Sequence, residues 1–295
     1  MSLTQPQPSR GGEPARPVGR WRLLLPQLRR QRVGLGAAIF LLVVAASGIL
    51  APQLAPYDPL RIDARNTLAP PSGEHWFGTD DVGRDVFSRV LWGARISLRV
   101  GFVSAIISTV IGVVLGLVSG YYEGAVGFVI LRAMDLLLAF PGILLALAIV
   151  SILGSSIENV MIAVGISAVP TFTRVVHGSV LSVKQNDYVE GARALGCRAV
   201  GMFRRHIFPN VLAPVIVLFT LQIGAAIFSA SSLSFIGLGA QPPSPEWGAM
   251  VSRGRYALSN AFWMSAFPGL AIALVVIAIN VLGDSLRDLL DPRIR

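Results

Sequence analysis

Hydrophobic positions in this chain run in long unbroken stretches that alternate with short charged segments. Aspartate, glutamate, lysine and arginine are all absent from 33–57, 100–122, 136–157, 207–245 and 256–283. A helix that crosses a membrane needs about 20 mostly apolar residues at about 1.5 Å each, so each stretch is long enough to span. A sixth, shorter stretch, 159–173, ends at Arg174, whose long side chain can reach the membrane interface. The pattern therefore predicts an all-α membrane protein with about six transmembrane helices.

Proline and glycine indicate where these helices bend or approach one another. The segment Phe140-Pro141-Gly142 lies inside the third span, at about 134–153, and Pro141 is expected to kink that helix. Gly112 and Gly116 form a small-xxx-small pair in the second span, which lets helix backbones approach closely. This pair favours tight packing within one bundle over homodimerisation.

Basic residues predict the orientation. Arginine and lysine gather on the cytoplasmic side of membrane proteins, and the first 32 residues hold seven arginines and one acid. Threading alternately from a cytoplasmic N-terminus places 119–134, 174–206 and 284–295 on that same side. Both termini are thus predicted to be cytoplasmic. Trp247 and Trp263 would suit the outer membrane interface, where aromatic side chains gather.

Three regions follow from this threading. Residues 1–30 form a basic cytoplasmic N-tail, expected to be disordered because it is rich in proline, glycine and arginine. Residues 31–283 form the transmembrane domain, with an outer loop at about 55–94 and a cytoplasmic loop at about 177–209. Residues 284–295 form a cytoplasmic C-tail.

Composition limits the function classes. Of the 295 residues, 53% are hydrophobic and 14% charged, against about 25% charged in soluble domains. The net charge of +9 is explained by membrane topology, so no nucleic-acid partner is expected. Cys197 is the only cysteine, which excludes an intrachain disulfide. The only lysine, Lys184, is outside any GxxxxGK[ST] motif, so the chain is predicted to have no nucleotide site and not to be an enzyme.

The cytoplasmic loop from Lys184 to Pro209 has the most specific local chemistry. Asp187 can cap a helix, Glu190 can complete a capping box, and Gly196 can end the helix. The helix predicted from these signals, about Tyr188 to Leu195, has Tyr188, Ala192 and Leu195 on one apolar stripe and is too short to be stable alone. Docking in a groove of another protein and lying on the membrane surface both suit such a helix.

Charged residues also cluster in the outer loop. The acids Asp80, Asp81 and Asp85 alternate with Arg84 and Arg89. Paired carboxylates can serve a metal or acid–base site, but this alternation favours ion pairs that pin a short turn or helix. No metal is expected, because the histidines also lack the spacing of zinc ligands.

The cytoplasmic loop resembles the EAA loop of membrane subunits of binding-protein-dependent ABC importers. Glu190-Gly191-Ala192 is followed by Gly196 six residues after the glutamate and by Pro209 thirteen residues later. The chain departs from the family pattern Glu-Ala-Ala…Gly…Ile-x-Leu-Pro at Gly191, His206 and Phe208. Glycine in place of alanine weakens the short helix by about 1 kcal/mol.

Other segments resemble the C-type membrane subunits of the dipeptide/oligopeptide (and nickel) branch of these importers. They follow one another in order along nearly the whole chain: 51–59, 75–89, 93–98, 233–248 and 286–293. The resemblance implies a transmembrane domain like that of type I ABC importers, with a cytoplasmic coupling helix, in the bacterial plasma (inner) membrane. It implies import of short peptides, with nickel chelates or glutathione as alternatives. An ion-coupled secondary transporter and a membrane scaffold are rivals from other classes, the first disfavoured by charge-free spans and the second by the loop.

The resemblance also implies partners and site residues. The partners are a second (B-type) permease subunit, two cytoplasmic ATPase domains, an extracytoplasmic binding protein and membrane lipid. ATP and Mg would be used by the ATPases, and no cofactor is expected on this chain. ATPase coupling is expected of Asp187, Tyr188, Glu190, Gly191, Ala192, Arg193, Leu195, Gly196 and Pro209, with Arg193 and Arg198 as rim contacts. Contact with the binding protein, or gating, is expected of Asp80, Asp81, Gly83, Arg84 and Asp85.

Overall fold

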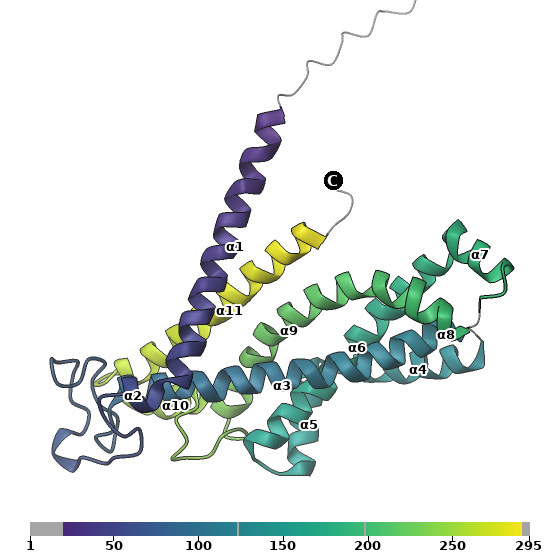
Figure 1. Ribbon diagram of the computed structural model, residues 1–295. Helices are drawn as coiled ribbons and strands as arrows, with labels where there is room; N and C mark the ends of the chain where they lie inside the picture. The colour runs from purple at the N-terminus through teal and green to yellow at the C-terminus, as the bar shows by residue number, and fades with distance from the viewer. Residues whose placement is uncertain (1–19, 123, 198, 291–295) are drawn as a thin grey trace, which may run out of the picture.

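The chain is almost entirely helical in the computed structural model, which describes residues 20–122, 124–197 and 199–290 (Figure 1). Five of the described helices are long and apolar enough to cross a membrane, and a bent pair of shorter helices makes up to six. The five are α1 (Arg20–Ile49), α3 (Val86–Tyr121), α6 (Ile157–Lys184), α9 (Phe208–Phe235) and α11 (Trp263–Leu290). The predicted all-α membrane fold is confirmed.

Helix α3 is central to the bundle and packs against α1, α6 and α9. Its contact with α6 is close because glycines line it. A Cβ atom on Gly116 would lie 2.6 Å from Cβ of Val176, and one on Gly112 would overlap Phe172. The pair Gly112 and Gly116 therefore serves packing within the bundle, as predicted.

The third predicted span is not a kinked continuous helix, and its predicted bounds of 134–153 are wrong. It consists of α4 (Ala125–Leu138) and α5 (Gly142–Leu153), whose axes differ by 91°. Pro141 stands just before α5 with an extended ψ of 131°. Proline lacks an N–H and also disfavours helical geometry in the residue before it, so the chain breaks here and restarts.

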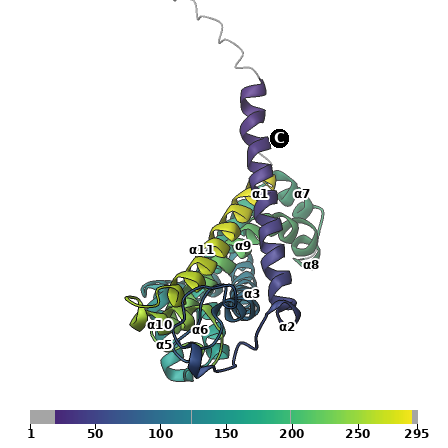
Figure 2. The ribbon, with the colours of Figure 1, turned by 90° about the vertical axis from the view of Figure 1, so that its left-hand side faces the viewer.

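Helix α1 begins at Arg20, so disorder predicted for the whole of 1–30 does not hold for residues 20–30. Trp21 and the leucines after it lie at the start of α1, and the arginines of this segment also favour helix. Residues 1–19 lie outside the described part. Helix α1 packs against α11, and the two run side by side in both views (Figures 1 and 2).

Short elements gather at two opposite ends of the bundle (Figure 1). One end carries α7 (Asp187–Ala194), α8 (Ala199–Met202) and a π-helix, η2 (Phe203–Ile207), which runs directly into α9. The other end carries the outer loop with α2 (Ala51–Leu54) and η1 (Ala64–Asn66), together with α10 (Trp247–Gly254) and η3 (Arg255–Ala257).

The two tryptophans predicted for the membrane interface are buried instead. Trp247 and Trp263 belong to one hydrophobic cluster beneath the outer loop. Their indole N–H groups donate to the carbonyls of Val90 and Thr79 at 3.0 and 3.1 Å. A large ring whose single donor is satisfied inside the protein contributes more by packing than by contact with lipid headgroups.

Candidate functional site

Helix α7 is the predicted coupling helix, displaced by one residue. The Asn186 carbonyl accepts from the N–H groups of Val189 and Glu190, so Asp187 is the first helical residue and not, as predicted, the cap. The stop at Gly196 is confirmed. That glycine has φ +77°, and the Cys197 N–H donates to the Ala192 carbonyl at 3.0 Å, closing the helix end.

One face of α7 is anchored within the chain. Val189 is 1% exposed and belongs to a hydrophobic cluster with Met202, Ile207 and Val211, against which Ala192 also packs. Sequence reasoning missed Val189. The only available signal was an apolar residue one position from the predicted stripe, between two residues assigned to the site.

The other face of α7 has no cover in the described chain. Leu195 is 91% exposed and Tyr188 49% exposed, while Glu190 and Gly191 are exposed as well. The predicted apolar stripe is thus divided, with Ala192 partly buried and the other two members open. Tyr188 in the helix and Leu195 just after its end are therefore open to contact with another molecule.

A polar contact ties this exposed face to the start of α9. The side-chain amide of Asn210 donates to Oη of Tyr188 at 3.2 Å and to the His206 carbonyl at 2.6 Å. The rings of Tyr188 and His206 lie 5.9 Å apart. Pro209 is in the first turn of α9, directly after the π-helix η2, whose Phe203 carbonyl accepts from the Phe208 N–H. Tyr188 of α7 is thus in direct contact with the first turn of α9.

Two predicted rim contacts cannot be placed. The side chain of Arg193 and the whole of Arg198 lie outside the described part of the chain.

At the opposite end, the predicted ion pairing of the outer loop is confirmed. Asp80 accepts from Nε of Arg84 at 2.7 Å, and Nε of Arg89 lies 3.8 Å from the same carboxylate. Asp85 caps α3 by accepting from the Ser88 N–H at 2.7 Å, and its other oxygen lies 2.9 Å from Nδ1 of His75. Charged groups this deeply buried persist because each is paired and hydrogen-bonded.

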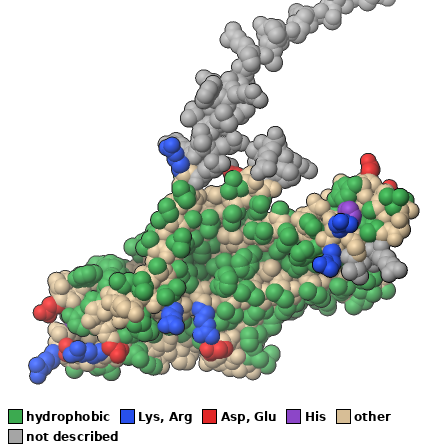
Figure 3. Space-filling model, in the orientation of Figure 1, with side chains coloured by type: hydrophobic (Ala, Val, Ile, Leu, Met, Phe, Trp, Pro, Cys, Tyr) green, Lys and Arg blue, Asp and Glu red, His purple; other side chains and the backbone are tan. Residues whose placement is uncertain are grey.

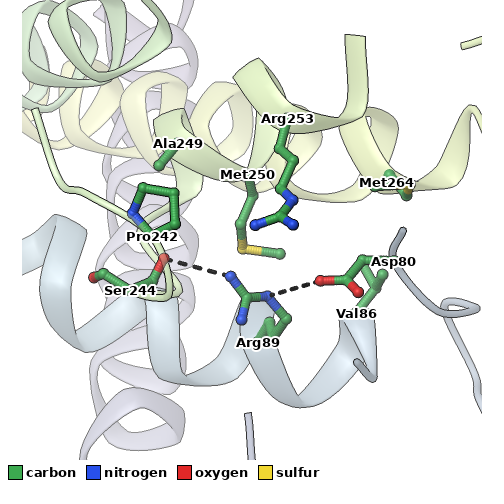
Figure 4. Close-up of a pocket in the computed structure, with 9 residues that line it drawn as sticks. All are labelled: Asp80, Val86, Arg89, Pro242, Ser244, Ala249, Met250, Arg253 and Met264. Carbon is green, nitrogen blue, oxygen red and sulfur yellow. Dashed lines mark hydrogen bonds and ion pairs between the residues drawn. The ribbon is translucent and has the colours of Figure 1, made fainter. Parts of the chain in front are cut away.

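Arg89 joins three segments (Figure 4). Its Nη1 donates to the Pro59 carbonyl at 2.8 Å and to the Pro243 carbonyl at 3.3 Å, and its Nη2 donates to the Ser244 carbonyl at 3.4 Å. The residue thus fastens both the outer loop and the segment between α9 and α10 to the start of α3. A small pocket lies beside it, between Asp80 and Arg253.

The outer-loop candidates differ in accessibility. Asp80, Arg84, Asp85 and Gly83 are buried, and Gly83 has φ +80°, a conformation that favours glycine. Asp81 is exposed, and its carboxylate pairs with Nε of Arg253 at 2.7 Å. The buried four shape the loop from within, and Asp81 is the member open to an external contact.

Glu246 caps α10 from a buried position that sequence reasoning did not identify. Its carboxylate accepts from the N–H groups of Gly248 and Ala249 at 2.9 and 2.8 Å. Burial raises the pKa of Glu246, and these two backbone donors oppose the rise only in part.

The helical membrane bundle, with its short anchored helix at one end, is similar in fold to solved structures. Two inward-facing structures of the MetNI methionine ABC transporter superpose with TM-scores of 0.58 at 17% and 18% identity, covering 69% and 70% of this chain and 96% and 97% of theirs. The fold is that of the membrane domain of a type I ABC importer.

Sequence comparison defines the family. The profile of the binding-protein-dependent transport system inner membrane component matches residues 112–295, and that of the N-terminal TM domain of oligopeptide transport permease C matches residues 19–71. The chain belongs to this family of ABC importer permeases. It is 48% identical over 276 residues to the glutathione transport system permease protein GsiD of Escherichia coli O157:H7 and of Shigella sonnei, covering 93% of this chain and 91% of each relative.

Family membership confirms the resemblance noted in the motifs and makes the chain a multi-pass inner-membrane transport subunit. The alternatives of an ion-coupled secondary transporter and a membrane scaffold are thereby set aside.

Proposed function

We propose that this permease forms one half of the translocation path of an importer for short peptides, with glutathione as the first candidate, and that ATPase closure reaches it through α7. The observation that carries the coupling proposal is the exposed face of α7, with Tyr188 open on a helix that Val189 anchors from behind and Leu195 open just past its end. A short helix with an open apolar face suits helix-in-groove docking. In this proposal the groove belongs to a cytoplasmic ATPase. The predicted topology places both chain termini on the same side as α7, which is then the cytoplasmic side.

Helix α9 carries the motion to the opposite side of the membrane. It is attached to α7 through Asn210 and Val211, and its 28 residues extend about 42 Å at 1.5 Å each. Its far end leads into the segment that Arg89 fastens at Pro243 and Ser244. A displacement of α7 would therefore shift this segment relative to the outer loop, at the hydrogen bonds that Arg89 makes.

The outer loop is the proposed receiving surface for the binding protein. Asp81 and Arg253, exposed or half-exposed, would contact the binding protein, while Asp80, Arg84 and Asp85 hold the loop in shape. A B-type permease subunit would supply the other half of the path, and the ATPase domains would use ATP and Mg. This chain contributes the path and the coupling helix.

Glutathione is the first solute to test because the relatives that are 48% identical over most of their length are named as glutathione permeases. Glutathione is itself a short peptide, so it lies within the broader substrate class. Nickel chelates are the competing class.

The test is reconstitution of the complete importer in proteoliposomes, with ATP hydrolysis and solute uptake measured together. Glutathione, a dipeptide and a nickel–histidine chelate are supplied one at a time with the binding protein. We expect glutathione or the dipeptide to stimulate both hydrolysis and uptake. Response to the nickel chelate alone would overturn the substrate proposal, and failure of ATPase subunits to co-purify would overturn the coupling proposal.

A charge reversal separates docking from general damage. Glu190→Arg is expected to abolish co-purification of the ATPase subunits because Glu190 lies on the open face of α7. Glu74→Arg is the matched control, since Glu74 is exposed on the outer loop at the other end of the bundle. Equal loss in both variants would contradict the assignment of α7 as the coupling helix.

A further inference from the structure

Two arginines on α3 have no partner among the described residues. Arg95 and Arg99 are exposed and lie one helical turn apart on the same face. Their nearest acidic neighbours in the sequence, Asp80, Asp81 and Asp85, are each paired with another cation or histidine. The face therefore presents two arginines that make no ion pair with the described residues.

Their depth along α3 places these charges at a membrane boundary. The helix has no charged residue from Val100 to Tyr121, a length of about 33 Å that matches the hydrocarbon core of about 30 Å. Arg99 therefore lies at the outer edge of the core and Arg95 about 6 Å further out, at the level of lipid headgroups.

Below the arginines the same face is apolar. Phe102, Ile106 and Val110 follow at helical spacing, with exposed fractions of 50%, 40% and 58%. Figure 3 shows basic side chains, with an acidic side chain close to them, on a broad hydrophobic surface on the face toward the viewer. Positive charge above an apolar stripe complements an amphiphile that has an anionic head and an extended hydrocarbon tail.

We propose that Arg95 and Arg99 bind the phosphate of an anionic phospholipid from the outer leaflet, whose acyl chain lies along Phe102, Ile106 and Val110. Guanidinium groups bind phosphate oxygens through paired, charge-assisted hydrogen bonds. A translocated peptide could offer a carboxylate to the arginines, but it has no long hydrocarbon tail to lie along the apolar stripe that runs into the membrane. The lipid would fix α3 beside the loop that Arg89 fastens to it.

The experiment measures lipid retained by the purified complete importer, so its outcome does not depend on the transported solute. The complex is exchanged into detergent with equal amounts of phosphatidylglycerol and phosphatidylcholine, washed, and examined by native mass spectrometry. We expect wild type to retain phosphatidylglycerol with a preference on the order of tenfold, as two basic side chains near anionic lipid would produce.

Arg95→Gln/Arg99→Gln should lose this preference. The matched control is Arg61→Gln/Arg65→Gln, which removes two exposed arginines from the outer loop and should keep it. The single variants Arg95→Gln and Arg99→Gln keep the test decisive if the double variant does not fold. Equal retention of both lipids by wild type, or an unchanged preference in Arg95→Gln/Arg99→Gln, would overturn the proposal. Glutathione binding that depends on the two arginines, without any lipid preference, would also overturn it and assign them to the substrate path.

Discussion

Leu195→Asp tests whether the open face of α7 docks against an ATPase. Leu195 is 91% exposed, so the substitution removes almost no contact within the chain. Surface substitutions of this kind change the free energy of unfolding by about 0.5 kcal/mol or less. The thermal unfolding of the isolated permease should therefore be unchanged.

The effect on docking should be large. Burial of a leucine side chain contributes about 1.5–3 kcal/mol. An aspartate in the same apolar groove adds a desolvation cost of about 1–3 kcal/mol. The sum is at least about 2.5 kcal/mol, which corresponds to a Kd roughly 60-fold weaker.

The assay titrates the ATPase subunits onto the permease pair in lipid nanodiscs and measures their affinity. Leu60→Asp is the control, because Leu60 is also an exposed leucine but lies on the outer loop. Wild-type ATPase affinity in a folded Leu195→Asp variant would refute docking through this face of α7.

Three further predictions concern individual positions. Gly191→Ala should stabilise α7 by about 1 kcal/mol, because a Cβ atom there meets nothing within 4 Å; slower hydrogen exchange of the α7 amides would show it. Arg89→Met should destabilise the chain by about 3 kcal/mol, because three carbonyls lose a charged donor; thermal unfolding and proteolysis of the outer loop measure this. Burial raises the pKa of Glu246, so the native state keeps the Glu246 proton at pH values where the unfolded chain has lost it. The stability that this difference contributes is complete below about pH 4.5, the ordinary pKa of glutamate, and is lost as the pH rises through the native pKa. Glu246→Gln should flatten that part of the pH profile of thermal unfolding, and an unchanged slope would contradict the assignment.

The membrane spans could be predicted because one physical requirement controls them. A helix in hydrocarbon satisfies its own backbone and tolerates few charges, so charge-free stretches of sufficient length indicate spans directly. A bend was predicted correctly at Pro141, but the same composition suits both a kinked helix and two helices at 91°, and the chain has the second. Only the packing of α4 and α5 against their neighbours distinguishes the two.

Helix α7 was predictable in position and less so in detail. Glycine at a helix end has a local cause, so the stop at Gly196 was predicted correctly. The cap assigned to Asp187 was wrong because the Asn186 carbonyl, one residue earlier, accepts the first bonds of the helix. Val189 and Asn210 were missed because their partners are far along the chain or on another element.

The sequence by itself determined the class of protein, most of the spans, the position of α7 and the ion-paired character of the outer loop. These depend on local composition and on spacing within a few turns of helix. Tertiary structure decided which side chains are buried: Trp247 and Trp263 beneath the outer loop, Val189 behind α7, and Arg89 between three segments. Burial depends on which distant elements pack together. An arginine or tryptophan side chain can be either buried or exposed, so its sequence position alone does not determine its burial.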